Sequence, residues 1–437
     1  MAQISSFGGL QTSLRGLLAH QRMLDVASHN IGNADTVGYT RQTTVASAAA
    51  GIAVNGATNG GVNWLGQGVD VTAFNRMRDE YLDISARTQN MLLGERGALA
   101  EGLSRADAAF SEPSDQGLNA LMDKMWTSFQ KLSTNPSDSG VRAQVVADAK
   151  NLTDAMKEID SRLAQIGADA ATQYAQLTSA PGNKVGAYAD ELSKLNDAIG
   201  EAVAAGQQPN DMLDRRDLIL DELAQLGQVS VSNQGNGRIS VSFGDASSPL
   251  VDGSGQPSVA TWPQALVNPG GQLGGLIKVQ TAISDYRAQL DNVASSLASS
   301  VNAVHGAPPF FTGATAGTLA VNVTAATLVA GTGTGAASND VALALSQLRG
   351  GTSDRAYQDL VRQTGSDAQN AATMRDLSVS LVNDVESRRQ SVSGVSLDEE
   401  MTDLIRFQRG YQASSRAMST MDEMLDVLIN RTGRVGL

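Results

Sequence analysis

Residues 395–430 read VSLDEEMTDLIRFQRGYQASSRAMSTMDEMLDVLIN, and this stretch decides the outline of the fold. Its apolar residues recur at alternating steps of four and three, the spacing of one face of an α-helix. Ser396 and Glu399 supply an N-cap and its capping-box partner. At ~1.5 Å per residue such a helix extends about 50 Å, so we predict that it lies along a partner helix. Its seam residues are Leu397, Met401, Leu404, Tyr411, Met418, Met421, Leu425 and Leu428.

The partner is predicted at the other end of the chain. Residues from about Ser6 to Ile31 form a second helical pattern with one narrow apolar seam, made of Leu10, Leu14, Leu17, Leu24 and Ile31. A helix with so thin a stripe is marginal alone. Heptad-spaced apolar residues by themselves more often mark an ordinary core, but a seam at both ends favours assembly. The helix stops at a turn-rich run whose key residues are Asn30, Asn33, Gly38 and Tyr39.

The middle of the chain alternates helical and Gly-rich stretches. Helices are predicted from about Phe74 to Leu226, broken at SEPSDQG (111–117) and NPSDSG (135–140), with Trp126 in the core. VSVSNQGNGRISVSFG (229–244) predicts a β-hairpin around Gly-Asn-Gly. Helix returns at 276–304 and from 341 onward, with a Thr/Gly/Ala-rich strip with β-like pieces at 306–338 between them.

The predicted fold is mainly α with a small β-rich insert. Residues 1–45 and 395–437 form a terminal coiled coil. Residues 46–227, 270–305 and 340–394 form an elongated helical rod. Residues 228–269 and 306–339 form one short outer β domain.

Composition excludes several functions. There are 32 basic and 45 acidic residues, a net charge of −13, which argues against nucleic-acid binding and attachment to anionic lipid. No apolar run reaches the ~20 residues needed to cross a bilayer. The chain has no cysteine, so no disulfide or thiolate site exists. The N-terminus lacks the features of a cleaved secretory signal, so we expect a cytoplasmic protein or one exported without cleavage.

Catalytic, cofactor and metal sites are not predicted. The densest acidic cluster, Asp211, Asp214, Asp217, Asp221 and Glu222, has arginines interleaved, so we interpret it as a helix start with surface ion pairs rather than a metal site. His20, His29 and His305 have no companions at a useful spacing and are interpreted as surface or interface residues. The Gly-rich segments lack the Lys-Ser/Thr of a phosphate loop.

The motifs resemble a known family. SHNIGNADTVGYTRQ (28–42) and the C-terminal helix resemble the shared ends of bacterial flagellar axial proteins. FSEPSDQGLNALMDKMWTSFQKLSTNPSD (110–138), PNDMLDRRDLILDELAQLG (209–227) and GGQLGGLI (270–277) resemble the flagellar hook-associated protein 1 family, which forms the hook–filament junction. The matches occur in family order over most of the chain.

The resemblance implies a structural, non-enzymatic subunit of the extracellular flagellum, exported through the flagellar type III channel. Its expected partners are copies of itself in a helical ring, the hook protein, the second junction protein and an export chaperone that holds the C-terminal helix. Larger members carry an outer insert where this chain has only 306–338, so the outermost domain is expected to be missing.

Two other functions stay open on the sequence alone. A hook or filament subunit shares the terminal motifs but lacks the internal motifs at 110–138 and 209–227, and it forms long polymers alone. A secreted hydrolase carried on flagellar-like ends is a third class, disfavoured because the β-rich inserts hold no histidine beyond His305 at their boundary.

Overall fold

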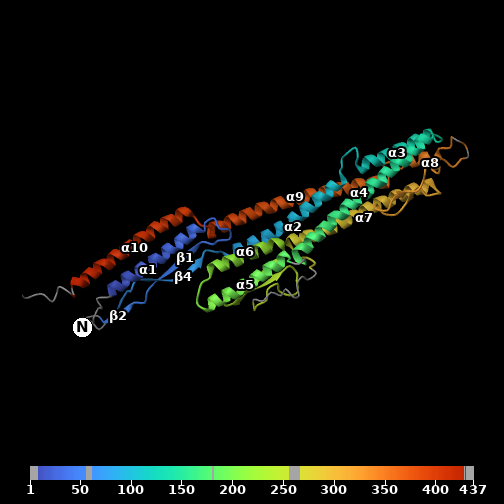
Figure 1. Ribbon diagram of the computed structural model, residues 1–437. Helices are drawn as coiled ribbons and strands as arrows, with labels where there is room; N and C mark the ends of the chain where they lie inside the picture. Colours follow the sequence, from blue (N-terminus) through green and yellow to red (C-terminus); the bar gives the residue numbers. More distant parts are fainter. Residues whose placement is uncertain are drawn as a thin grey trace, which may run out of the picture.

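The computed structural model describes residues 8–55, 62–179, 182–254, 266–333, 335, 337–427 and 429. The molecule is elongated, with the two terminal helices side by side at one end and a bundle of long helices extending from them (Figure 1). The predicted mainly α fold is confirmed, because the strands are few and short among the described residues.

The terminal module, as we call residues 8–76 and 397–427, combines two helices with a β ribbon. Its elements are α1 (Gly8–Gly32), β1 (Gln42–Ala48), β2 (Ile52–Asn55), β3 (Val62–Leu65), β4 (Val69–Arg76) and α10 (Leu397–Asp426). β1 pairs antiparallel with β4 and β2 with β3. The ribbon lies beside α1 (Figure 1).

This ribbon differs from the sequence-based expectation. The sequence predicts 46–76 as part of the helical rod, with an irregular or weakly stranded stretch at 47–68 and helix from about Phe74. In the structure the apolar and polar residues of 69–76 alternate along strand β4, and α2 starts at Glu80, where the Asp79 carboxylate caps the amides of Tyr81 and Leu82.

The rod, residues 80–393, is built mostly of long helices around one large core. Its main elements are α2 (Glu80–Phe110), α3 (Leu118–Thr134), α4 (Ser139–Thr178), α7 (Gly271–His305), α8 (Asp340–Ser346) and α9 (Thr352–Ser393). The breaks expected at 111–117 and 135–140 separate α2, α3 and α4. Trp126, predicted as core, is fully buried and donates from Nε1 to both carboxylate oxygens of Asp354 at 3.1 Å.

A second, smaller core lies beside the first. It is formed by α5 (Lys184–Ala204), α6 (Asn210–Leu226) and the hairpin β5 (Val229–Gly235) to β6 (Arg238–Phe243). The predicted hairpin is present, with its turn at Asn236 and Gly237 in left-handed conformations. The Asn196 side chain of α5 donates to the Ile239 carbonyl of the hairpin at 2.7 Å, which holds the hairpin against α5.

The two Gly-rich stretches do not form one outer β domain. Residues 239–251 pack in the smaller core, whereas Phe310, Phe311 and Leu319 belong to the large core near α3 and α7. In 306–339 only β7 (Phe311–Thr312) and β8 (Ala320–Val321) are strands among the described residues. The apolar side chains of each stretch are too few for a core of their own, so each joins the nearest helices.

Glycines allow α2 to lie very close to α6 and α7. A Cβ on Gly94 would lie 2.1 Å from the Gln225 carbonyl oxygen, and one on Gly275 would lie 2.4 Å from that of Glu95. The GGQLGGLI motif therefore lets the start of α7 pack directly on the α2 backbone.

Candidate assembly interface

The two terminal helices run antiparallel in close contact. Met421 lies against Gly9, Ser414 against Gly16, and the His20 ring against Gly410. A Cβ on Gly410 would lie 2.5 Å from the His20 ring, so these glycines permit the close approach of the two backbones. The pairing brings together segments about 400 residues apart in sequence (Figure 1).

The seam residues divide into two sets. The half-buried set comprises Leu10, Leu17, Leu24, Ile31, Leu404, Tyr411, Met418, Met421 and Leu425. The exposed set comprises Leu14, Leu397 and Met401. Leu428 lies outside the residues whose side chains are described.

Ile405 extends an exposed apolar row on α10 whose first two members, Leu397 and Met401, belong to the predicted seam. Leu397, Met401 and Ile405 are spaced by four residues and are 52%, 51% and 46% exposed. Leu18 on α1, and Met424 and Val427 near the end of α10, are also exposed. The i to i+4 spacing was the signal that could have found this row. The pairing of α1 with α10 therefore leaves apolar surface uncovered in the single chain.

The turn after α1 forms a buried polar knot. The Asn30 side chain donates to the Gln42 carbonyl at 2.9 Å and to Glu400 at 3.1 Å, and its Oδ1 accepts from the Gln42 amide at 3.0 Å and from the Tyr39 hydroxyl at 2.7 Å. Glu400 also accepts from Arg41 Nε at 2.7 Å. The knot thus joins α1, β1 and the first turn of α10.

The other predicted turn residues shape the loop around this knot. The Asn33 side chain donates to the His29 carbonyl at 3.0 Å and accepts from Thr36. Gly38 has φ +81°, a left-handed conformation that suits glycine. Burial raises the pKa of Tyr39, and the nearby carboxylates of Asp211, Asp214 and Glu400 raise it further, so its hydroxyl remains a donor.

The role of Glu400 was missed from sequence. Asp398, Glu399 and Glu400 stand at the start of α10, where acidic residues are expected because they interact favourably with the helix dipole. The sequence does not indicate that Glu400 is buried. Its side chain is 4% exposed, against 64% for Glu399. Glu400 differs from Glu399 because the Asn30 side chain and Arg41 Nε both bind Glu400 at the start of α10.

Part of the acidic cluster of α6 is buried, although Asp211 at its start is exposed. Its four aspartates, Asp211, Asp214, Asp217 and Asp221, repeat every three or four residues along one face, which we call the acidic stripe. Asp214, Asp217 and Asp221 are largely buried, each against arginine. The expectation of surface ion pairs was wrong for these three, because α2 packs against α6 and arginines of β4, α2 and α9 lie against these carboxylates.

Asp217 makes the stability of this region sensitive to acid. Burial alone would raise its pKa, but Arg78, Arg76 and Arg87 outweigh burial and leave the pKa lowered. A lowered folded-state pKa contributes stability above the unfolded-state value of about 4, which is lost as pH falls through the folded-state value. We therefore expect wild type to lose stability below about pH 4 more steeply than Asp217→Asn, measured by urea unfolding at each pH. Equal pH slopes would contradict this assignment.

Comparison with known proteins supplies the family. Residues 103–319 match the model of the flagellar hook-associated protein FlgK helical domain. Residues 10–40 match the flagella basal body rod protein model, and residues 387–431 match the flagellar basal body rod FlgEFG protein C-terminal model. Flagellar hook-associated protein 1 of Bacillus subtilis is 27% identical over 510 aligned positions, covering 98% of this chain and 99% of the relative. The chain belongs to the flagellar hook-associated protein 1 family.

Other proteins named flagellar hook-associated protein 1 are also similar to this chain. The Salmonella typhimurium protein is 25% identical over 561 positions, covering 96% of this chain and 98% of the relative. The alignment is longer than the 437 residues of this chain, so gaps must be placed in this chain to align the two sequences. The flagellar hook junction protein FlgK from Burkholderia pseudomallei overlaps 52% of this chain and 44% of its own, at 24% identity and a TM-score of 0.45.

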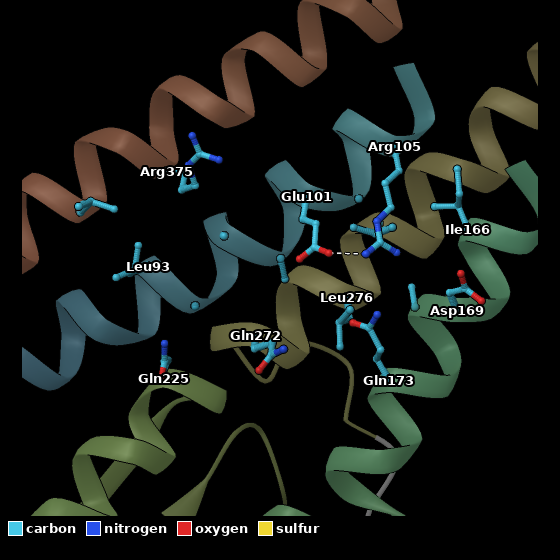
Figure 2. A pocket seen from close by; sticks show the side chains of 17 residues that line it. Leu93, Glu101, Arg105, Ile166, Asp169, Gln173, Gln225, Gln272, Leu276 and Arg375 are labelled. Atoms are coloured by element: carbon cyan, nitrogen blue, oxygen red, sulfur yellow. Dashed lines mark hydrogen bonds and ion pairs between the residues drawn. The ribbon is translucent and has the colours of Figure 1, made fainter. Parts of the chain in front are cut away.

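Hook-associated protein 1 is a structural component of the flagellum and not an enzyme, and it assembles with other flagellar components. A groove beside α2, of about 340 Å³, is lined by residues of α2, α4, α6, α7 and α9 (Figure 2). Its charged residues include Glu101 and Arg105, which pair with each other (Figure 2).

The position of His305 differs from the interpretation made from the sequence. His305 was expected near the surface, but it is buried, with its ring nitrogens 2.9 Å from the Pro308 carbonyl and 3.0 Å from the Val329 amide. No group of three potential metal ligands occurs among the described residues. Nor does any described helix have the length and apolar character to cross a bilayer.

Proposed function

We propose that this chain forms the junction between the flagellar hook and filament, and that it assembles into a helical ring through its paired terminal helices. The observation that carries the proposal is the exposed apolar surface of the α1–α10 pair. Leu397, Met401 and Ile405 form a row about half exposed on a helix whose other face already has a partner. A lone apolar side chain on a surface is ordinary, but a row along one helix face matches the helix-packing surface of another chain.

The residues proposed for assembly are those of the two predicted apolar seams, together with Ile405 of the exposed row. In this proposal the half-buried set holds α1 to α10 within a subunit, while the exposed set contacts neighbouring copies. The polar knot around Asn30 and Glu400 sets where α10 starts relative to α1. The terminal module is then the inner, self-associating part, and the rod lies further out.

The proposed partners are further copies of this chain, the hook protein and the second junction protein. An export chaperone would hold the apolar face of α10 before assembly. We propose export by the flagellar type III route without a cleaved leader and an extracellular location on the flagellum.

The alternative of a hook or filament subunit has less support. The two terminal family models carry rod-protein names, but the model over 103–319 is specific to the hook-associated protein. A junction subunit is expected to stop at a short ring. Growth of long filaments by the pure protein alone would favour the alternative.

A double substitution tests the exposed row. Met401→Asp with Ile405→Asp is expected to leave the thermal unfolding of the monomer unchanged, because both side chains are exposed. It is expected to abolish incorporation, because charge would be buried against a neighbouring copy. Incorporation is measured by electron microscopy of hook–filament structures, and by motility, in cells that lack the natural protein.

The matched control uses the rod. Met374→Asp with Leu377→Asp changes two α9 side chains that are 49% and 50% exposed, and it is expected to leave incorporation intact. Normal motility of the α10 variant, or equal loss in both variants, would refute the proposed interface.

A further inference from the structure

The terminal module and the rod meet without a shared hydrophobic core. Neither apolar cluster contains a described residue of α1, β1–β4 or α10. The chain crosses between the two parts at only two places, residues 77–79 and 394–396. Leu218, which lies against Gly38, is an apolar contact between them. Apolar burial is the main source of cohesion in proteins, so the relative orientation of the two parts must depend on other contacts.

One such contact is a backbone bond, from the Arg41 amide to the Ser393 carbonyl at 2.9 Å. Most of the side-chain contacts come from the acidic stripe of α6. Asp211 accepts from Gln42 Nε2 at 3.1 Å. Asp214 accepts from the Thr40 amide at 3.1 Å and from Arg76 Nη1 at 2.8 Å. Two successive turns of a rod helix thus bind the turn after α1, β1 and β4 of the terminal module.

The next two turns of α6, at Asp217 and Asp221, bind arginines of other rod helices as well as Arg76. Asp217 accepts from Arg76 of β4 at 2.8 Å, and also from Arg78 and from Arg87 of α2. Asp221 pairs with Arg87 at 2.8 Å and with Arg389 near the end of α9 at 2.7 Å. The stripe therefore contacts every element that enters the joint from the rod side, including the ends of α2 and α9 that lead into the terminal module.

Uncharged bonds reinforce the same contact. Asn210, the first residue of α6, donates to the Phe74 carbonyl at 2.9 Å and to Gln42 Oε1 at 3.0 Å. Gln208 accepts from the Phe74 amide at 2.7 Å. The start of α6 is thus fitted to one edge of β4 by directional bonds.

We propose that α6 is a polar clamp that sets the angle between the terminal module and the rod. Buried ion pairs contribute little net free energy of folding, because the cost of desolvating the charges offsets their attraction. Their hydrogen bonds are directional, so they form in one relative placement of the two parts. A joint made of them holds a defined angle, and it opens when charges are removed without exposing either hydrophobic core. The clamp is a property of the single subunit, independent of what the terminal module assembles with.

Site-directed spin labelling tests the clamp directly. The chain contains no cysteine, so cysteines placed at exposed Ser380 on α9 and exposed Arg409 on α10 carry the only labels across the joint. A second pair at Ser380 and Thr172, both exposed and both in the rod, reports the rod itself. Electron–electron resonance measures the distance distribution of each pair.

The decisive variant is Asp214→Asn with Asp217→Asn, which removes two charges and keeps side-chain size. We expect the distribution across the joint to broaden about twofold or more, because Arg76 loses both carboxylates, while the rod pair and the helical circular dichroism stay unchanged. Arg76→Gln is a milder second variant that should broaden the same distribution. Asp123→Asn is the control, since it removes an exposed Asp123–Arg349 pair within the rod and should change neither distance.

Two results would overturn the proposal. An unchanged distribution across the joint in both clamp variants would mean that the angle is set elsewhere. Broadening of the rod pair together with loss of helical signal would mean that the stripe holds the rod and not the joint.

Discussion

Replacing Trp126 by alanine is expected to lower the free energy of unfolding of the rod by about 3–5 kcal/mol. The side chain is 1% exposed and packs beside Phe129 in the large core. Removing it leaves a cavity, and it also removes the indole donor from the buried Asp354 carboxylate. Urea unfolding followed by circular dichroism measures the change.

Trp64 provides the matched control for the same substitution. It lies on β3 and is 72% exposed, so Trp64→Ala is expected to change the unfolding free energy by less than about 0.5 kcal/mol. Trp126→Phe should fall between the two, because it keeps most of the ring volume and loses only the donor. Similar losses for both tryptophan-to-alanine variants would contradict the packing described here.

Replacing Glu400 by glutamine is expected to weaken the attachment of α10 by about 2–3 kcal/mol, because Arg41 and Asn30 lose a buried charged acceptor. The effect should be local, since the terminal module shares no core with the rod. Native-state hydrogen exchange should show α10 amides exchanging about 30- to 150-fold faster, which is the same free energy expressed as a rate ratio. Amides in α4 and α7 should keep their protection.

Glu399→Gln controls for the loss of charge itself. Glu399 pairs with the same arginine, at 3.0 Å from Nη1, but its side chain is exposed. Exposed ion pairs contribute about 0–1 kcal/mol, so exchange in α10 should change little. Equal acceleration in both variants would show that the burial of Glu400 is not what anchors the helix.

Much of the helical layout could be predicted from the sequence. The breaks at Pro113 and Asn135 depend on residues that interrupt a helix whatever surrounds them. The hairpin around Asn236 depends on alternation and on a turn that needs left-handed residues. The turn residues Asn30, Asn33, Gly38 and Tyr39 were likewise visible as a motif, although their bonds were not.

Other features could not be predicted because their neighbours are distant in sequence. The burial of Asp214, Asp217 and Asp221 depends on arginines of β4, α2 and α9, and acidic residues at a helix start are usually solvated. The segment 306–339 has β-like composition, but its Phe310 and Phe311 fill a gap in the helical core. Local pattern does not say which core receives an apolar side chain.

The sequence by itself determined that both ends of this chain carry helices with apolar seams, because helical periodicity is a property of residues three and four apart. Only the tertiary structure decided which face of α10 is covered. Leu404 is half-buried and Leu397 remains exposed, although both belong to the same predicted seam. The reason is that α10 packs closely against one partner helix, α1, through glycines, and a single partner helix covers only one side of α10.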